Sequence, residues 1–197
     1  MPLYSGGMEF SMKKICIIMS SLALVMSMSA CGGKTKAPDV SELEKISPDQ
    51  LLTVEAVSTI TGVDMIVDEE GVTTDGDATS VTYVPKEAYS DYPVTISIEQ
   101  FSESLTPEQV WYHYENSRIY RGVEGEEILQ GIGEEYHIAY PFINVYDRGC
   151  FIRISAGEGS GSEQKELLEN LASIAAGEVE RVIPEETYNV AKSNVIK

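Results

Sequence analysis

Residues 92–101 contain the pattern that most restricts the fold of this chain. Val94, Ile96 and Ile98 alternate there with polar residues. Because successive side chains of a strand point to opposite faces, this alternation predicts a strand with one apolar and one polar face. Strands of this kind are typical of antiparallel sheets, whereas strands of parallel sheets are apolar on both faces. The stretch therefore predicts an antiparallel sheet.

Further segments carry strand patterns and are separated by short turns. The predicted strands are residues 63–67, 79–85, 127–130, 136–140, 143–146 and 150–156. The predicted turns are the acidic sequence Asp68-Glu69-Glu70-Gly71, the pair Asp75-Gly76 and the sequence Asp147-Arg148-Gly149. Asp and Gly favour such turns because they tolerate the backbone conformations that reverse the chain. Strands joined by turns this short form hairpins, which again favours an antiparallel sheet.

Two helices are predicted from their starts. The first follows Ser47 and ends before Gly62, and the second follows Thr106 and spans residues 107–120. Each of these Ser and Thr residues is followed by Pro and, three residues on, by Gln, which is the pattern of a capping box. The packed stripe expected on the second helix consists of Val110, Trp111, Tyr114 and Ile119.

A third helix is predicted between the loop at residues 157–161 and Gly177. Ser160 or Ser162 is expected to cap its start, and its leucine, isoleucine and alanine residues recur at helical spacing. Gly177 is expected to end it, because glycine readily adopts the left-handed conformation found after helices. The order of the predicted helices and strands along the chain predicts an α+β domain, with an antiparallel sheet of about six strands and three helices packed on it.

Residues 12–31, MKKICIIMSSLALVMSMSAC, follow the layout of a secretory signal. Lys13 and Lys14 supply a basic start, an uncharged apolar run follows, and two small residues precede Cys31. A transmembrane helix needs about 20 apolar residues, and this run is shorter and interrupted by serines. A buried core helix would rarely begin with two lysines and end in Cys-Gly-Gly.

The cysteine directly after the small pair makes this segment similar to a bacterial lipoprotein signal, with Met28-Ser29-Ala30-Cys31 as the lipobox. The resemblance implies that the Cys31 thiol carries a diacylglyceryl group and becomes the first residue of the mature protein. Two acyl chains anchor a protein stably to a membrane. We therefore expect lipid anchoring through Cys31 on the extracytoplasmic face of the cell membrane. Residues 1–11 do not fit a signal, and we expect Met12 to be the true start.

The charge of the chain narrows the choice of partners. It contains 32 acidic and 14 basic residues, which gives a formal net charge of −18. An acidic surface argues against nucleic acid as a partner and against direct adhesion to an anionic membrane surface. If Cys16 is removed with the signal and Cys31 is lipidated, Cys150 is the one cysteine left, and no intrachain disulfide is expected.

Four regions are expected along the chain. They are the signal with a spurious N-terminal extension (1–31), a flexible tether (32–47), a single α+β domain (48–183) and a polar tail (184–197). This order, together with Leu51-Leu52-Thr53-Val54-Glu55 and Gly131-Ile132-Gly133-Glu134-Glu135-Tyr136, resembles small lipoproteins of unknown function in Gram-positive bacteria. Their domain is similar to the PsbP-like α/β sandwich, and the resemblance implies no catalytic residues.

Residues able to carry catalysis or bind metal are few. His113 and His137 have no partner at metal-ligand spacing, such as a second histidine four residues away. Cys150 lies in a strand pattern, where a free cysteine behaves as a small hydrophobic residue. We therefore expect no catalytic residue, no metal ligand and no cofactor. A nucleophilic Cys150 with a distant histidine is the alternative.

Two other motifs contain groups that could bind a ligand. The acidic residues between Asp64 and Asp77 offer oxygen atoms to calcium, but they do not match the calcium-binding loop with its glutamate at the twelfth position. Turns favour the same residues, so solvated turns are the preferred interpretation and a weak calcium site the alternative. Gly131 and Gly133 lack the third glycine of a dinucleotide-binding loop and are better explained as a bend between strands.

Aromatic residues are the remaining candidates for a binding surface. The set is Tyr83, Tyr89, Tyr92, Trp111, Tyr112, Tyr114, Tyr120, Tyr136, Tyr140 and Tyr146. Tyrosine has an apolar body and a polar tip, so it serves both in the cores of sheets and at binding surfaces. Packing in the core is the preferred interpretation for most of them. Within the set, Trp111, Tyr112 and Tyr114 on the second helix are the expected binding residues.

Two kinds of function remain. The favoured one is a non-catalytic binding or interaction module, anchored outside the cell, that recognises an envelope protein, an envelope polymer or a small ligand. The alternative is an extracytoplasmic enzyme, for example a hydrolase that acts on the cell envelope. An enzyme would require a pocket with two perturbed titratable groups, whereas a module would expose an aromatic surface.

Overall fold

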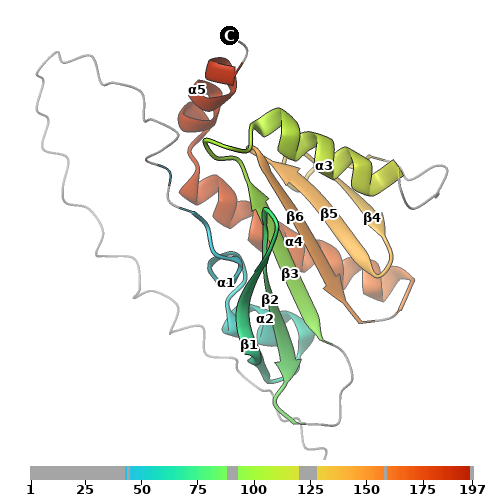
Figure 1. Ribbon diagram of the computed structural model, residues 1–197. Helices are drawn as coiled ribbons and strands as arrows, with labels where there is room; N and C mark the ends of the chain where they lie inside the picture. The colour runs from blue at the N-terminus through green and yellow to red at the C-terminus, as the bar shows by residue number, and fades with distance from the viewer. Residues whose placement is uncertain (1–42, 44, 88–92, 120–127, 158, 196–197) are drawn as a thin grey trace, which may run out of the picture. The chain divides into compact units, whose positions relative to one another are not determined.

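The computed structural model describes residues 43, 45–87, 93–119, 128–157 and 159–195. The chain divides into two compact units, Met1–Thr35 and Lys36–Lys197, and every described residue belongs to the second. Cys31, the whole signal and most of the tether lie outside the described residues. The described part contains six strands in one antiparallel sheet and five helices (Figure 1). The α+β class and the six-stranded antiparallel sheet are confirmed, but the helices number five and not three.

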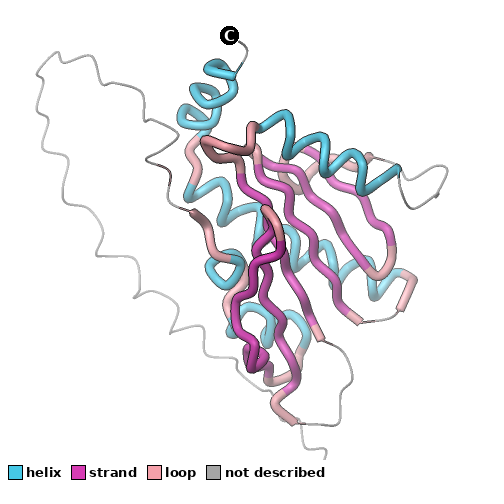
Figure 2. Tube along the Cα trace, viewed as in Figure 1, coloured by secondary structure: helices cyan, strands magenta, loops and turns pink. Residues whose placement is uncertain are grey.

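The sheet has the strand order β1-β2-β3-β6-β5-β4, and every neighbouring pair is antiparallel. Its strands, magenta in Figure 2, are β1 (Met65–Asp75), β2 (Ala78–Pro85), β3 (Val94–Gln100), β4 (Glu135–Ala139), β5 (Phe142–Asp147) and β6 (Cys150–Ala156). The alternation in β3 is confirmed, because Val94, Ile96 and Ile98 are all buried. Ile96 lies opposite Ile154, which lies opposite Ile143, so one face of the sheet is continuously apolar.

Helices cover both faces of the sheet (Figure 1). The apolar face packs against α1 (Pro48–Leu51), α2 (Val54–Thr61) and α4 (Ser162–Val182), and α3 (Pro107–Ile119) packs on the opposite face. On α3, Tyr114 contacts Tyr146 of β5 and Phe151 of β6. The face of the sheet with the polar alternation is therefore covered over β3, β6 and β5. No helix in the described residues is both long and apolar enough to cross a membrane.

The first predicted helix is broken in two. Ser47 occupies the N-cap position as predicted, and Gln50 accepts a hydrogen bond from its backbone N–H (2.9 Å). The Ser47 hydroxyl donates to Asp49 and does not cap the helix, and α1 ends at Leu51. Leu52 is extended and buried, and its carbonyl accepts a hydrogen bond from the Tyr83 hydroxyl. Thr53 then caps α2, its hydroxyl accepting from the Ala56 N–H (3.2 Å). A tertiary contact thus interrupts a helix that local pattern alone would continue.

The acidic sequence after Val67 is not a turn, contrary to expectation. β1 continues through it as a bulge, because Val67 pairs with Tyr83 while Val72 pairs with Val81. The chain reverses later, between Asp75 and Ala78, as the pair Asp75-Gly76 predicted. The strand predicted at residues 127–130 is not formed among the described residues, which begin at residue 128 in this stretch. It is replaced by a single bridge between Leu129 and Tyr136.

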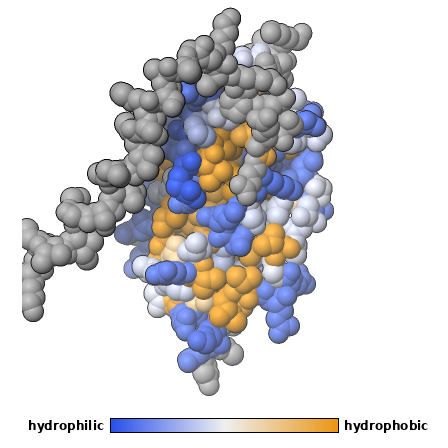
Figure 3. All heavy atoms as spheres, turned by 90° about the vertical axis from the view of Figure 1, so that its left-hand side faces the viewer, coloured by the Kyte–Doolittle hydropathy of each residue, from blue (hydrophilic) through white to orange (hydrophobic). Residues whose placement is uncertain are grey.

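β1 is an edge strand and leaves several apolar side chains in solvent. Those of Ile66, Val67 and Val72 are exposed. Figure 3 views the side of the sheet where β1 lies and shows apolar side chains interspersed with hydrophilic ones. The acidic bulge at residues 68–71 falls between these valines, and bulges and charges are common devices that keep an edge strand from pairing with another chain.

The C-terminal region differs most from expectation. Gly177 lies inside α4, which continues to Val182 and ends before Pro184, and Gly161, not Ser160 or Ser162, occupies the N-cap position. Residues 184–197, expected as a polar tail, contain the helix α5 (Glu185–Val195). Tyr188 and Ala191 of α5 are buried, at 4% and 2% exposure. Tyr188 also contacts the Phe101 ring and the Tyr146 hydroxyl, so the Tyr188 and Ala191 side chains, three residues apart, form the face of α5 that packs against the domain.

Candidate functional site

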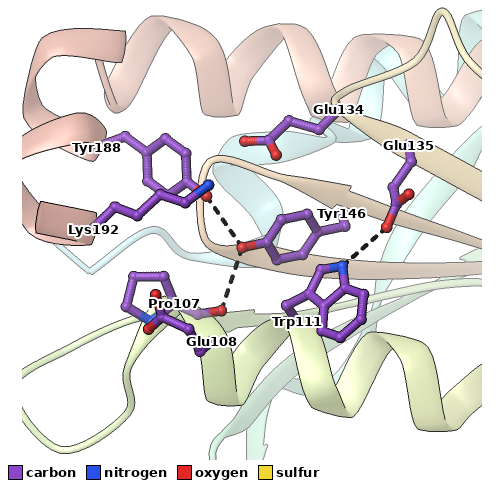
Figure 4. Close-up of a pocket in the computed structure, with 8 residues that line it drawn as sticks. All are labelled: Pro107, Glu108, Trp111, Glu134, Glu135, Tyr146, Tyr188 and Lys192. Atoms are coloured by element: carbon purple, nitrogen blue, oxygen red, sulfur yellow. Dashed lines mark hydrogen bonds between the residues drawn. The ribbon is translucent and has the colours of Figure 1, made fainter. Parts of the chain in front are cut away.

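A hollow of about 380 Å³ opens between α3, β5 and α5 (Figure 4). We call it the aromatic groove, and its lining residues are Pro107, Glu108, Trp111, Glu134, Glu135, Tyr146, Tyr188 and Lys192. The start of α3 is fixed by a complete capping box. Thr106 donates its N–H to the Gln109 side chain (2.8 Å), and Gln109 donates its N–H to the Thr106 hydroxyl (3.3 Å). The predicted cap of this helix is confirmed, and it sets the position of the groove wall.

Two tyrosines form the inner part of the groove. The Tyr146 hydroxyl donates to the Pro107 carbonyl (3.3 Å), so the Tyr188 hydroxyl is left to donate to Tyr146 (3.2 Å). Burial raises the pKa of both phenols above its ordinary value. Both hydroxyls are therefore neutral at physiological pH and can serve as hydrogen-bonding groups but not as bases.

Trp111 forms the outer wall. Its indole N–H donates to the Glu135 carboxylate (3.1 Å), and 43% of the residue remains exposed. The Lys192 ammonium lies 5.4 Å from the centre of the Tyr188 ring. The groove thus combines aromatic surface with three carboxylates and one ammonium, a mixture typical of binding sites for partly polar ligands.

The three predicted binding residues on α3 have different fates. Trp111 lines the groove, and Tyr112 is 60% exposed on α3 but does not line it. Tyr114 is fully buried and packs against His137 (ring centres 5.1 Å apart), so it cannot contact a ligand at the surface. Neighbouring residues of a helix point about 100° apart. For this reason Trp111 lines the groove, Tyr112 points into solvent and Tyr114 packs in the core. Trp111 was also expected in the packed stripe, where the structure does not place it.

A second hollow of about 370 Å³ adjoins the groove and shares Glu134, Tyr188 and Lys192 with it. We call it the acidic hollow, and its lining residues are Gly133, Glu134, Asp147, Arg148, Glu180, Glu185, Tyr188, Asn189 and Lys192. Gly133 allows the close approach that shapes it: a Cβ there would lie 2.9 Å from both the Asp147 Cβ and the Tyr146 carbonyl oxygen. Its φ of 60° also favours glycine, which agrees with the predicted bend.

Asp147 is the most perturbed carboxyl of this region. It is 3% exposed, and burial raises its pKa from 3.8 to about 7. This value already includes the smaller effects of Glu180 and Glu134, which raise the pKa, and of Arg148, which lowers it. The Arg148 guanidinium is itself committed to the end of α4, where it donates to the carbonyls of Glu180 (2.9 Å) and Ile183 (2.7 Å). Asp147 is consequently poised to change charge near neutral pH.

The histidines lie away from both hollows. Nδ1 of His113 lies 2.6 Å from the Glu99 carboxylate across α3 and β3, so His113 has a partner that sequence spacing did not reveal. Nε2 of His137 contacts the Asn144 amide nitrogen (3.1 Å), and Arg153 donates to the Asn144 oxygen (2.8 Å). This order fixes the amide orientation and leaves Nε2 of His137 as the acceptor. His137 and Asn144 are buried, and their network fits a role in holding β4, β5 and β6 together.

Cys150 is fully buried at the start of β6, more deeply than the half-buried position expected. Burial raises the pKa of its thiol, and Asp147 raises it further. Since the thiolate is the reactive form, this thiol is not activated as a nucleophile. Within the described residues, no group of three or more His, Cys, Asp or Glu side chains is arranged to hold a metal ion.

The chain matches no protein-family model, no curated protein and no solved structure. The site is therefore defined by geometry alone. Sequence reasoning found Trp111 but missed Tyr188, Lys192 and Asp147. A signal for the first two was present, because Tyr188 and Ala191 stand at helical spacing in an otherwise polar segment.

Proposed function

We propose that this chain is a lipid-anchored, extracytoplasmic binding module of the bacterial cell envelope, and that it binds its ligand in the aromatic groove. The observation that carries the binding function is the exposed Trp111 ring on the wall of a groove lined by uncharged tyrosines and charged side chains. Aromatic residues of this kind dominate the energetics of binding sites, because they bury a large area at little entropic cost.

The order of the signal residues supports a lipid anchor at Cys31, and the fold is compatible with the family that the sequence resembles. The Cys31 position is that of a lipidated cysteine in a lipoprotein signal. An antiparallel sheet with helices on both faces is compatible with the PsbP-like sandwich suggested by the sequence. The partner is an envelope protein, an envelope polymer or a small ligand, and the acidic chain disfavours nucleic acid.

The test begins with the capture of the partner. Cross-linking on intact cells with the lipidated protein, and with a lipid-free form as control, identifies what the module touches. Affinities of purified variants then follow from calorimetry. Trp111→Ala should weaken binding about thirtyfold, since truncating an aromatic anchor commonly costs about 2 kcal/mol or more. Tyr112→Ala, on the same helix but outside the groove, should bind as the wild type does, and equal affinities for all three proteins would refute the groove as the site.

One observation favours the alternative function, an envelope hydrolase. His113 and Glu99 form a carboxylate–imidazole pair at 2.6 Å, with 41% of the His113 side chain exposed. Such pairs orient a histidine as a general base. Loss of function in His113→Ala, with an unchanged circular dichroism spectrum and with Trp111→Ala fully functional, would establish this alternative in place of the binding module.

A further inference from the structure

The acidic hollow has the chemistry of a site for a cation. Four of its lining residues are acids, namely Glu134, Asp147, Glu180 and Glu185, against the two bases Arg148 and Lys192. Arg148 is committed to backbone carbonyls of α4, and the Lys192 ammonium lies over the Tyr188 ring. Arg148 also lies 4.0 Å from the Glu180 carboxylate, so it partly offsets the acids, but four acidic residues against two bases leave the hollow with a negative character.

A second observation points to a ligand. Asp147 is 3% exposed, it lines the hollow, and its Oδ2 atom has no hydrogen-bond partner among the described residues. A buried polar atom without a partner costs free energy, so native structures rarely keep one without a reason. A hydrogen-bond donor that enters the hollow would satisfy this oxygen.

We propose that the acidic hollow binds a primary ammonium group, such as that of a lysine side chain, with Asp147 as its buried counter-charge. The inference rests on the proposed binding function, because the hollow shares Glu134, Tyr188 and Lys192 with the aromatic groove. A ligand whose apolar part contacts Trp111 can extend its cationic end past Tyr188 into the hollow.

The geometry selects an ammonium over other cations. A divalent metal ion prefers several oxygen ligands around one point, and no such cluster exists in the described residues. A guanidinium group is planar and prefers two parallel hydrogen bonds to one carboxylate, which requires more room beside the buried Asp147 carboxyl than a compact ammonium does. An ammonium is a compact charge that needs a single strong acceptor and can share its other protons with Glu180 or Glu134.

Binding is coupled to a proton. Because a positive charge beside a carboxyl favours its ionised form, the ammonium lowers the pKa of Asp147 from about 7 and releases its proton. Affinity therefore rises between pH 6 and pH 8. The titratable and charged groups that face Asp147 are Glu134 before β4, Arg148 in the β5–β6 turn, Cys150 on β6, Glu180 on α4, and Glu185, Tyr188 and Lys192 on α5.

The probe is Nα-acetyl-lysine methylamide, and its control is Nα-acetyl-norleucine methylamide, which has a similar length but no charge. Calorimetry on the full chain in detergent, in two buffers of different ionisation enthalpy, measures both affinity and proton release. We expect the lysine probe to bind at pH 8 at least about tenfold more tightly than the norleucine probe, with release of a fraction of a proton.

Asp147→Asn keeps the shape of the hollow and removes its charge, and it should abolish both the lysine preference and the proton release. Asp77→Asn, an exposed residue of the β1–β2 turn, makes the same change in net charge and should have no effect. Equal binding of both probes, full binding by Asp147→Asn, or calcium binding that Asp147→Asn abolishes would each overturn the inference. If the lysine probe fails while Trp111 is still required for partner binding, the inference falls and the proposed function stands.

Discussion

Asp147 links the stability of this domain to pH. Its carboxyl is buried beside Glu180 and Glu134, and its pKa is raised from 3.8 to about 7. The folded chain therefore holds this proton more tightly than the unfolded chain does. A group of this kind contributes stability that is fully present below about pH 4 and is lost as the pH rises through about 7.

Asp147→Asn should remove this contribution, because asparagine stays neutral and keeps the shape of the protonated side chain. Between pH 4 and pH 8, the free energy of unfolding of the wild type should fall relative to that of the variant. Urea unfolding of both proteins across this range measures the difference, and Asp77→Asn serves as the control for net charge. A constant difference between wild type and Asp147→Asn over the whole range would contradict the assignment.

At the scale of elements, local sequence sets some helix boundaries, such as the start after Thr106 and the end before Gly62, and tertiary contacts set others. The cap at Thr106 depends on residues three positions apart, and so the sequence alone predicted it. The break after Leu51 depends on Tyr83, which lies 31 residues away from the Leu52 carbonyl to which it donates. The continuation of α4 past Gly177 depends on Val179, which lies beyond the glycine and remains buried on the same helix.

Thr106→Ala should lower the free energy of unfolding by about 1 kcal/mol, because the Gln109 N–H loses its acceptor at the first turn of α3. Chemical denaturation measures this change. Ser162→Ala is the matched comparison, since Ser162 was expected as a possible cap but lies inside α4 and is exposed, and it should have almost no effect. An unchanged denaturation midpoint for Thr106→Ala would show that the hydroxyl does not stabilise the helix.

The sheet could be predicted from the sequence and the site could not, because the sheet depends on local patterns and the site on contacts between distant residues. Alternation and turn residues are properties of short segments, so β3 and the two hairpin turns were predicted from the sequence. The groove brings together Trp111 of α3, Tyr146 of β5, and Tyr188 and Lys192 of α5. No local sequence pattern predicts that these residues lie close together. Tyr114 illustrates the limit, because Trp111 and Tyr112 of the same aromatic run are exposed while it is buried.

At the scale of the whole molecule, charge and anchoring have separate roles. The formal net charge of −18 repels an anionic membrane surface and attracts cationic ligands, which is compatible with the lipid anchor proposed at Cys31. The sharing of residues between the groove and the hollow then lets one ligand use both aromatic and electrostatic contacts.

The anchor itself is tested at Cys31, which lies outside the described residues. Cys31→Ala should abolish incorporation of labelled fatty acid and move the protein from the membrane fraction to the medium, because it removes the thiol proposed to carry the lipid. Cys16→Ala is the matched control, because Cys16 lies in the apolar part of the predicted signal and should leave with it. This variant should be labelled like the wild type, since two acyl chains on Cys31 suffice for stable attachment. Labelling that persists in Cys31→Ala would refute the lipid anchor, and with it the location that the proposed function assumes.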